Sequence, residues 1–88
     1  MAKREVIVIN SKGLHARPAA MVAKIATTHD AEISITRGEE RADAKSVLSL
    51  LILAAGKGTP LQLEAQGVDA EHALDELEEL FLKRFGEE

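Results

Sequence analysis

The chain has 88 residues, of which 45% are hydrophobic and 30% are charged, and its formal net charge is −4. A chain of this length builds one domain (residues 1–88) with one modest core, so a deep active-site cavity is not expected. The only aromatic residues are Phe81 and Phe85, and there is no basic stripe, which argues against nucleic-acid binding. No cysteine is present, so disulfides and thiolate metal sites are excluded.

The first apolar run, residues 6–9, has only four residues and is too short for a signal-peptide core or a membrane span. We therefore expect a cytoplasmic protein without membrane insertion. Because this run is β-branched throughout, residues 5–9 are predicted to form a strand, followed by a turn over residues 10–13.

A helix is predicted from Ala16 to about Thr27, since small apolar residues at 19, 22, 23 and 26 fall on one face. Pro18 lies in its first turn, where the missing amide hydrogen costs nothing. Residues 32–36 alternate between polar and apolar, which predicts a half-buried strand. A tight turn over residues 37–40 then leads into a short strand at 41–43.

Ser46 is typical of an N-cap, and a short apolar helix is expected over residues 47–55 with Gly56 at its C′ position. Alternation predicts a strand over residues 60–66. Asp69 can then cap a last helix running to about Phe85. Its apolar stripe consists of Ala70, Ala73, Leu74, Leu77, Leu80 and Phe81.

The predicted order is therefore βαββαβα. Amphipathic helices must bury their apolar stripes, so they are expected to cover one face of a four-stranded sheet in a two-layer α+β domain. The alternating strands predict that the other face of the sheet is exposed to water.

The most informative segment lies at the predicted start of the first helix and reads Gly13, Leu14, His15, Ala16, Arg17, Pro18, Ala19. Free amides at a helix N-terminus, here those of Ala16 and Arg17, attract anions. Neutral imidazole has a nitrogen lone pair that can carry a phosphoryl group reversibly. A histidine before a helix is more often a capping or surface residue, so the joint pattern with Arg17 and Pro18 carries the phosphate interpretation.

This segment resembles the active-site signature of HPr, the histidine phosphocarrier of the bacterial phosphoenolpyruvate:sugar phosphotransferase system. The resemblance covers the whole chain, including residues 45–48, residues 55–58 and the acidic last helix. It implies an open-faced β-sandwich with an antiparallel sheet of strand order 1-4-2-3. It also implies that His15 accepts a phosphoryl group on Nδ1 from phosphorylated enzyme I and gives it to enzyme IIA domains of sugar permeases. Arg17 would be the charge partner, no cofactor would be needed, and the protein would be a carrier rather than a stand-alone enzyme.

The same resemblance gives two further regions a possible role. In many relatives the serine matching Ser46 is phosphorylated by HPr kinase/phosphorylase, although an N-cap role alone explains this residue. Val47, Leu48 and Leu51 resemble the apolar patch that docks on partners, whereas the alternative is that they belong to the core. Ala20 departs from the bulkier residue often seen at its position in the family, which points to an altered partner preference.

His29 and His72 have no ligand spacing, so we expect two surface residues and no metal site. The acids between residues 69 and 79 are expected to form a solvated helix face.

Two other functions stay open. The first is a nitrogen-branch paralogue with regulatory partners, and the second is a regulator that binds partners without carrying phosphate. Relatives of the second kind lack the active histidine, which is present here as His15. We expect a monomer.

Overall fold

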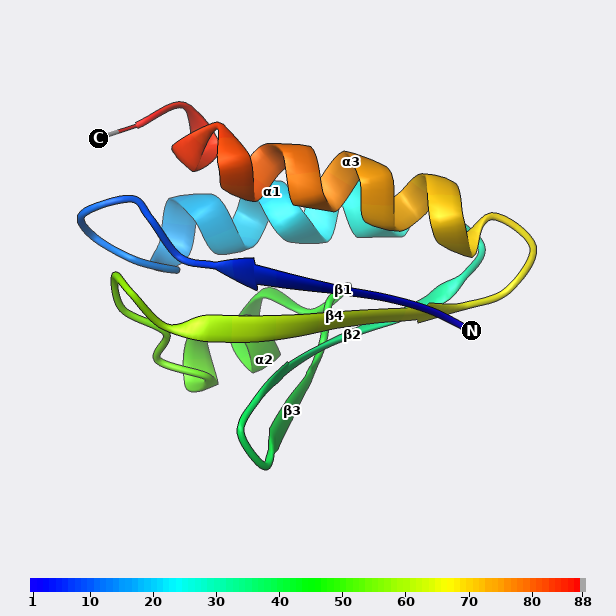
Figure 1. Ribbon diagram of the computed structural model, residues 1–88, viewed down its shortest axis with the longest axis horizontal. Helices are drawn as coiled ribbons and strands as arrows, with labels where there is room; N and C mark the ends of the chain where they lie inside the picture. The colour runs from blue at the N-terminus through cyan, green and yellow to red at the C-terminus, as the bar shows by residue number, and fades with distance from the viewer. Residues whose placement is uncertain (88) are drawn as a thin grey trace.

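A computed structural model describes residues 1–87 (Figure 1). Three α-helices and four β-strands follow one another in the predicted order, and a short 3₁₀ helix ends the described chain. The elements are β1 (Ala2–Ile7), α1 (Ala16–Thr27), β2 (Glu32–Arg37), β3 (Glu40–Asp43), α2 (Val47–Ile52), β4 (Pro60–Gln66), α3 (Ala70–Leu82) and η1 (Arg84–Gly86).

The strands form one antiparallel sheet of order β1-β4-β2-β3, which confirms the expected topology. The last strand in sequence, β4, lies between β1 and β2. Its residue Leu63 is directly opposite Arg4 on one side and Ile35 on the other. Side chains alternate along a strand, so Leu61, Leu63 and Ala65 all point to the same face, and all three are buried.

The helices lie along the sheet (Figure 1), and their buried apolar residues form one core cluster with those of the strands. α1 contributes Val22 and Ala26, α2 contributes Leu50, and α3 contributes Leu74 and Leu77, all of them fully buried. The opposite face carries polar side chains such as those of Gln62, Glu64 and Gln66, as the alternation predicts. None of the helices within residues 1–87 has the length and hydropathy of a bilayer-spanning segment.

The predicted boundaries of β1 and α2 are wrong. β1 covers Ala2–Ile7 rather than residues 5–9, because its pairing with β4 starts at Ala2 and ends where Ile7 lies opposite Pro60. α2 ends at Ile52 rather than at residue 55, and Ala54, with φ of 51°, takes the left-handed position that Gly56 was expected to provide. Carbonyls beyond the helix serve other segments, since Leu53 accepts a hydrogen bond from Arg37.

α3 also stops earlier than predicted, at Leu82. Arg84 and Phe85 then take left-handed backbone conformations, with φ of 56° and 55°. Phe85 is fully buried and meets Phe81 edge to face, with ring centroids 4.8 Å apart. Burial of this ring compensates the backbone strain and turns the chain back toward the start of α1.

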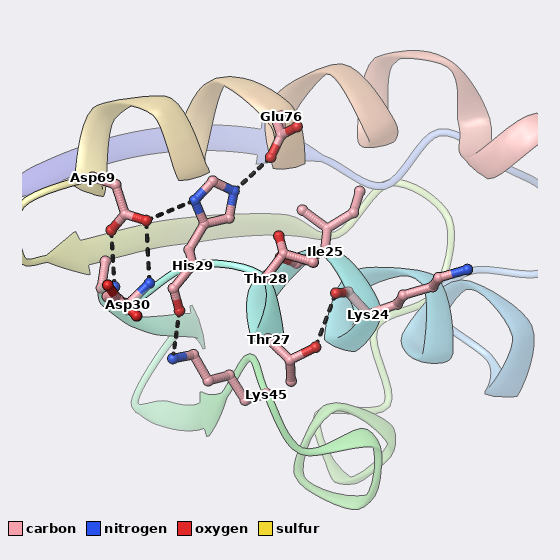
Figure 2. A network of polar contacts seen from close by, with 10 residues as sticks. Lys24, Ile25, Thr27, Thr28, His29, Asp30, Lys45, Asp69 and Glu76 are labelled. Carbon is pink, nitrogen blue, oxygen red and sulfur yellow. Dashed lines mark hydrogen bonds and ion pairs between the residues drawn. The ribbon is translucent and has the colours of Figure 1, made fainter.

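The prediction that His29 is a surface residue is wrong, because only 7% of it is exposed. Its Nδ1 lies 2.9 Å from the carboxylate of Asp69, and its Nε2 lies 2.5 Å from that of Glu76 (Figure 2). Both ring nitrogens can donate only in the imidazolium form. The hydrogen bond to Glu76, aided by that to Asp69, raises the pKa of His29 above its ordinary value although burial opposes it. His29 is therefore a structural cation that ties the end of α1 to α3.

Asp69 does not cap its own helix with its side chain. Instead it accepts hydrogen bonds from the amides of Asp30 and Ala31 as well as from His29 (Figure 2). Partial burial disfavours ionisation of Asp69, but the bonds from His29 and these amides outweigh it and hold its pKa below the ordinary value. On the same helix, Glu71, Asp75 and Glu78 pair with Arg4 of β1. The acids of α3 are thus only in part the solvated face that the sequence suggested.

Across residues 1–87, no cluster of three or more His, Cys, Asp or Glu side chains is arranged to hold a metal ion. His29 and His72 instead make an aromatic contact with each other. The exposed ring of His72 meets that of His29 edge to face, with centroids 5.4 Å apart.

We predict that His29→Gln lowers the free energy of unfolding by about 2 kcal/mol at pH 6, because a buried charged group loses two hydrogen bonds. A group whose pKa is raised in the folded state contributes its full stabilisation below its unfolded pKa, about 6.5 for histidine. That contribution is lost as the pH rises through the folded value, so the difference from the wild type should shrink between pH 6 and pH 9. Urea unfolding of both proteins over this range measures it. A difference that is constant or grows with pH contradicts the prediction.

Candidate functional site

The loop between β1 and α1 is held against the loop between α2 and β4. The Leu14 amide donates to the carbonyl of Ala55 over 2.8 Å, and the Val8 amide donates to the carbonyl of Thr59 over 3.0 Å. Gly13 adopts a φ of +70°, and a Cβ there would lie 2.5 Å from the Ala55 carbonyl oxygen. Glycine is required here for both its conformation and its size, and it sets where His15 emerges.

His15 is the N-cap residue of α1, with extended backbone angles of φ −83° and ψ −170°. Its carbonyl accepts the hydrogen bond from the Ala19 amide, but its side chain makes no capping bond. The ring is 35% exposed, and its Nε2 lies 2.9 Å from Oε1 of Glu87. No hydrogen bond from residues 1–87 reaches Nδ1. One nitrogen of the imidazole is therefore held by the protein while the other is available.

Arg17 lies beside His15 on the first turn of α1, as the sequence motif suggested. Its guanidinium, 57% exposed, donates from Nη1 to Oε2 of Glu87 over 3.0 Å and to the Phe85 carbonyl over 3.3 Å. Guanidinium has five N–H donors, so others remain for an anion. The structure brings the two motif residues together through a third residue, Glu87.

Glu87, whose side chain is only 19% exposed, and Asn10 are the residues of this site that the sequence did not reveal. Besides the contacts with His15 and Arg17, Glu87 accepts a hydrogen bond of 2.9 Å from Nδ2 of Asn10. The hydrogen bonds from His15 and Asn10 hold the pKa of Glu87 below its ordinary value, with a smaller contribution from Arg17. An ionised carboxylate thus lies between two groups that the motif supplies.

The start of α1 adds a partial positive charge to the site. The amides of Ala16 and Arg17 are in the first turn, where no intrahelical acceptor is available, and Pro18 has no amide hydrogen. α1 has 12 residues, so its macrodipole is well developed. An anion beside His15 would meet these amides and the Arg17 guanidinium together.

The residues expected to dock partners are exposed. The exposed fractions are 37% for Val47, 68% for Leu48 and 37% for Leu51, and Ala20 on α1 is exposed as well. Ile52, which the sequence reasoning did not single out, is 65% exposed. The alternative that these side chains belong to the core therefore fails for all of them, whereas their role in docking remains a prediction.

Ser46 is the N-cap of α2, as predicted. Its Oγ accepts a hydrogen bond of 3.2 Å from the Ser49 amide, and the side chain is half-buried. The geometry accounts for this serine by capping, and its phosphorylation remains a prediction.

Comparison with known proteins agrees with the fold and with the motif. A family model described as the PTS HPr component phosphorylation site matches residues 2–83. The chain belongs to the HPr family of phosphocarrier proteins. It is 40% identical over 88 residues to phosphocarrier protein HPr of Treponema pallidum, covering 100% of both chains. It is 45% identical over 85 residues to phosphocarrier protein NPr of Shewanella violacea, covering 97% of this chain and 93% of that one. The crystal structure of HPr-C-His from Thermoanaerobacter tengcongensis superposes with a TM-score of 0.96 at 33% identity, over 100% of this chain and 99% of that one.

The contact of Gly13 with the neighbouring loop can be tested by comparing two glycines with positive φ. Gly13→Ala should lower the free energy of unfolding by about 3 kcal/mol, because strain is added to a backbone collision. Gly38 has a φ of +59° with open space around it, so Gly38→Ala should cost only about 1 kcal/mol. Urea unfolding gives both values. Equal losses would show that the close approach to Ala55 does not constrain the loop.

Proposed function

We propose that the protein is a phosphocarrier of the phosphoenolpyruvate:sugar phosphotransferase system. His15 accepts a phosphoryl group from phosphorylated enzyme I and passes it to enzyme IIA domains of sugar permeases. The observation that carries this proposal is the arrangement at His15, the N-cap residue of α1: Nε2 of its ring is bound to Glu87, which also pairs with Arg17, and no hydrogen bond from the described residues reaches Nδ1. The His15 side chain is partly exposed, so partner proteins can reach it.

The transfer itself needs little from this chain beyond position and charge. The lone pair on Nδ1 of His15 attacks the phosphorus held by the donor protein, and a new N–P bond forms. The bond between phosphorus and the donor breaks, and its electron pair returns to the donor. Arg17 and the amides of Ala16 and Arg17 hold the phosphoryl oxygens, since phosphoryl transfer depends on positioning and on charge stabilisation. A histidine or another nucleophile of the acceptor then attacks the phosphorus and forms a new bond to it. The N–P bond breaks, and its electron pair returns to Nδ1 of His15.

A nitrogen-branch role is the second candidate, and the identity to NPr of Shewanella violacea favours it. The two candidates share the chemistry of His15 and differ in the partners that dock. Initial rates of phosphorylation by the sugar-branch and nitrogen-branch forms of enzyme I distinguish them. The leading proposal requires the faster rate with the sugar-branch donor.

The partner surface that we propose is the apolar patch formed by Ala20, Val47, Leu48 and Leu51, to which we add Ile52 because it is exposed on the same short helix. Exposed large apolar side chains gathered in one place favour a protein partner. Phosphorylation of Ser46 by HPr kinase/phosphorylase would add negative charge at the edge of this patch and weaken docking there. A cytoplasmic location and a monomeric state complete the proposal.

We expect incubation with phosphoenolpyruvate and enzyme I to add one acid-labile phosphoryl group to the protein, seen as an increase in intact mass. His15→Ala should abolish this increase because it removes the accepting nitrogen. His72→Ala is the matched control, since it removes an exposed histidine from the opposite end of the molecule and should leave the increase unchanged. Phosphorylation that persists in His15→Ala would refute the carrier role of His15.

If the apolar patch docks enzyme I, a charge placed in it should change the rate of phosphoryl transfer to His15 but not the number of phosphoryl groups accepted. Leu48→Glu should slow transfer from enzyme I about tenfold by placing a charge in an apolar interface, while stability stays within about 0.5 kcal/mol because the residue is exposed. Val68→Glu adds the same charge at a 94% exposed valine between β4 and α3, and should leave the rate unchanged. Stopped-flow or quenched-flow transfer rates measure both. Equal rates for the two variants would remove Leu48 from the interface.

A further inference from the structure

Asn10 is fully buried in the loop that follows β1, and it donates from Nδ2 to two acceptors. One is the carbonyl of Gly13, at 2.7 Å, and the other is Oε1 of Glu87, at 2.9 Å. The same Oε1 lies 2.9 Å from Nε2 of His15. A single carboxylate oxygen therefore links the buried amide to the imidazole.

The buried amide can have only one orientation here. Turning it over would bring Oδ1 against the Gly13 carbonyl and the Glu87 carboxylate, which are both acceptors. In the observed orientation Oδ1 is buried and receives no hydrogen bond from residues 1–87. A buried unpaired acceptor costs free energy. Asn10 thus keeps its contacts to the loop and to Glu87 at the expense of stability, as is typical of residues retained for function.

Among the described residues, Glu87 provides the one hydrogen bond to the His15 ring. The His15 side chain does not cap α1, and Glu87 is the one carboxylate that it contacts. Glu87 is ionised near neutral pH, because the hydrogen bonds from His15 and Asn10 lower its pKa. An ionised carboxylate only accepts hydrogen bonds, so in neutral His15 the proton must be on Nε2 and the lone pair on Nδ1.

We propose that Asn10 and Glu87 form a positioning pair that fixes the tautomer and the orientation of His15, so that its Nδ1 lone pair is presented to the phosphoryl donor. Asn10 holds Oε1 of Glu87 in place, and Glu87 accepts the Nε2 proton of His15. Nε2 keeps this proton throughout the transfer, so no proton has to move when the N–P bond forms at Nδ1. Glu87 then faces the positive charge that the ring gains. The pair acts through His15 and makes no contact with the phosphoryl group itself.

The role of the pair in phosphoryl transfer rests on the proposed phosphocarrier function. Its effect on the His15 tautomer does not, because the tautomer can be measured in the unmodified protein. Nitrogen-15 chemical shifts of the His15 ring, recorded at a pH at which the shifts show a neutral ring, report the ratio of the Nε2–H to the Nδ1–H form. We expect the Nε2–H form to predominate in the wild type. Glu87→Ala and Asn10→Asp should each lower the ratio about tenfold, the size of effect expected from losing a charge-assisted hydrogen bond.

Glu39→Ala is the matched control for Glu87→Ala, because Glu39 is exposed in the turn between β2 and β3, away from the β1–α1 loop that carries His15. It should leave the ratio unchanged. Thermal melting confirms that each variant is folded. If Asn10→Asp does not fold, Glu87→Ala still decides, since it alters a side chain outside the core. A wild-type ratio that is retained in folded Glu87→Ala or folded Asn10→Asp overturns the proposal, as does a predominant Nδ1–H form in the wild type.

A second measurement separates positioning from partner binding. Glu87→Ala should lower the rate constant of His15 phosphorylation severalfold at saturating enzyme I, with the KM for enzyme I unchanged. An increase in KM with an unchanged rate constant overturns the positioning role. If enzyme I does not phosphorylate the wild type at all, the proposed function fails, while the tautomer ratio still decides the role of Asn10 and Glu87.

Discussion

The pairing of β4 between β1 and β2 is the constraint on which the rest of the structure depends. It places Leu61, Leu63 and Ala65 on the helix-covered face, and a shift of one residue would move all three to water. The same pairing brings the two loops at that end of the sheet together, because Val8 and Thr59 continue the hydrogen bonding beyond the strands. The loop that carries His15 is therefore anchored by backbone hydrogen bonds to the loop after α2.

The site is assembled from three distant segments on this foundation. The loop over residues 8–15 provides Asn10 and His15, α1 provides Arg17, and the segment after α3 provides Glu87. That last segment reaches the site because Phe85 is buried against Phe81 and turns the chain through two left-handed residues. An apolar contact thus determines where a carboxylate lies. A change in the packing of Phe85 is therefore expected to move Glu87 and so to alter the surroundings of His15.

The features predicted correctly from the sequence are those set by interactions between residues close together in the chain. The bounds of α1 and β4, the capping of α2 by Ser46 and the burial of alternate residues in β4 all follow from spacing and from residue type. Apart from the ends of β1, α2 and α3, the errors concern partners that are remote in sequence. His29 is 40 and 47 residues from its two carboxylates, and His15 is 72 residues from Glu87. No periodicity reports such contacts, although the resemblance to the HPr family did supply the strand order. Near Glu87 itself, the sequence shows only an acidic residue that follows α3 and Phe85, and this pattern does not indicate a contact with His15.

The two histidines that contact carboxylates show how the number of partners decides between structure and chemistry. His29 is buried between Asp69 and Glu76, so both of its nitrogens donate and its raised pKa favours the cation. Such a ring has no lone pair to offer and serves as a link between α1 and α3. His15 is partly exposed and meets one carboxylate, so one nitrogen is fixed and the other stays available. A second carboxylate at Nδ1 would turn His15 into another structural cation, and it would repel the phosphoryl oxygens that Arg17 and the start of α1 attract. The open side of His15 is therefore as much a part of the site as the residues that hold it.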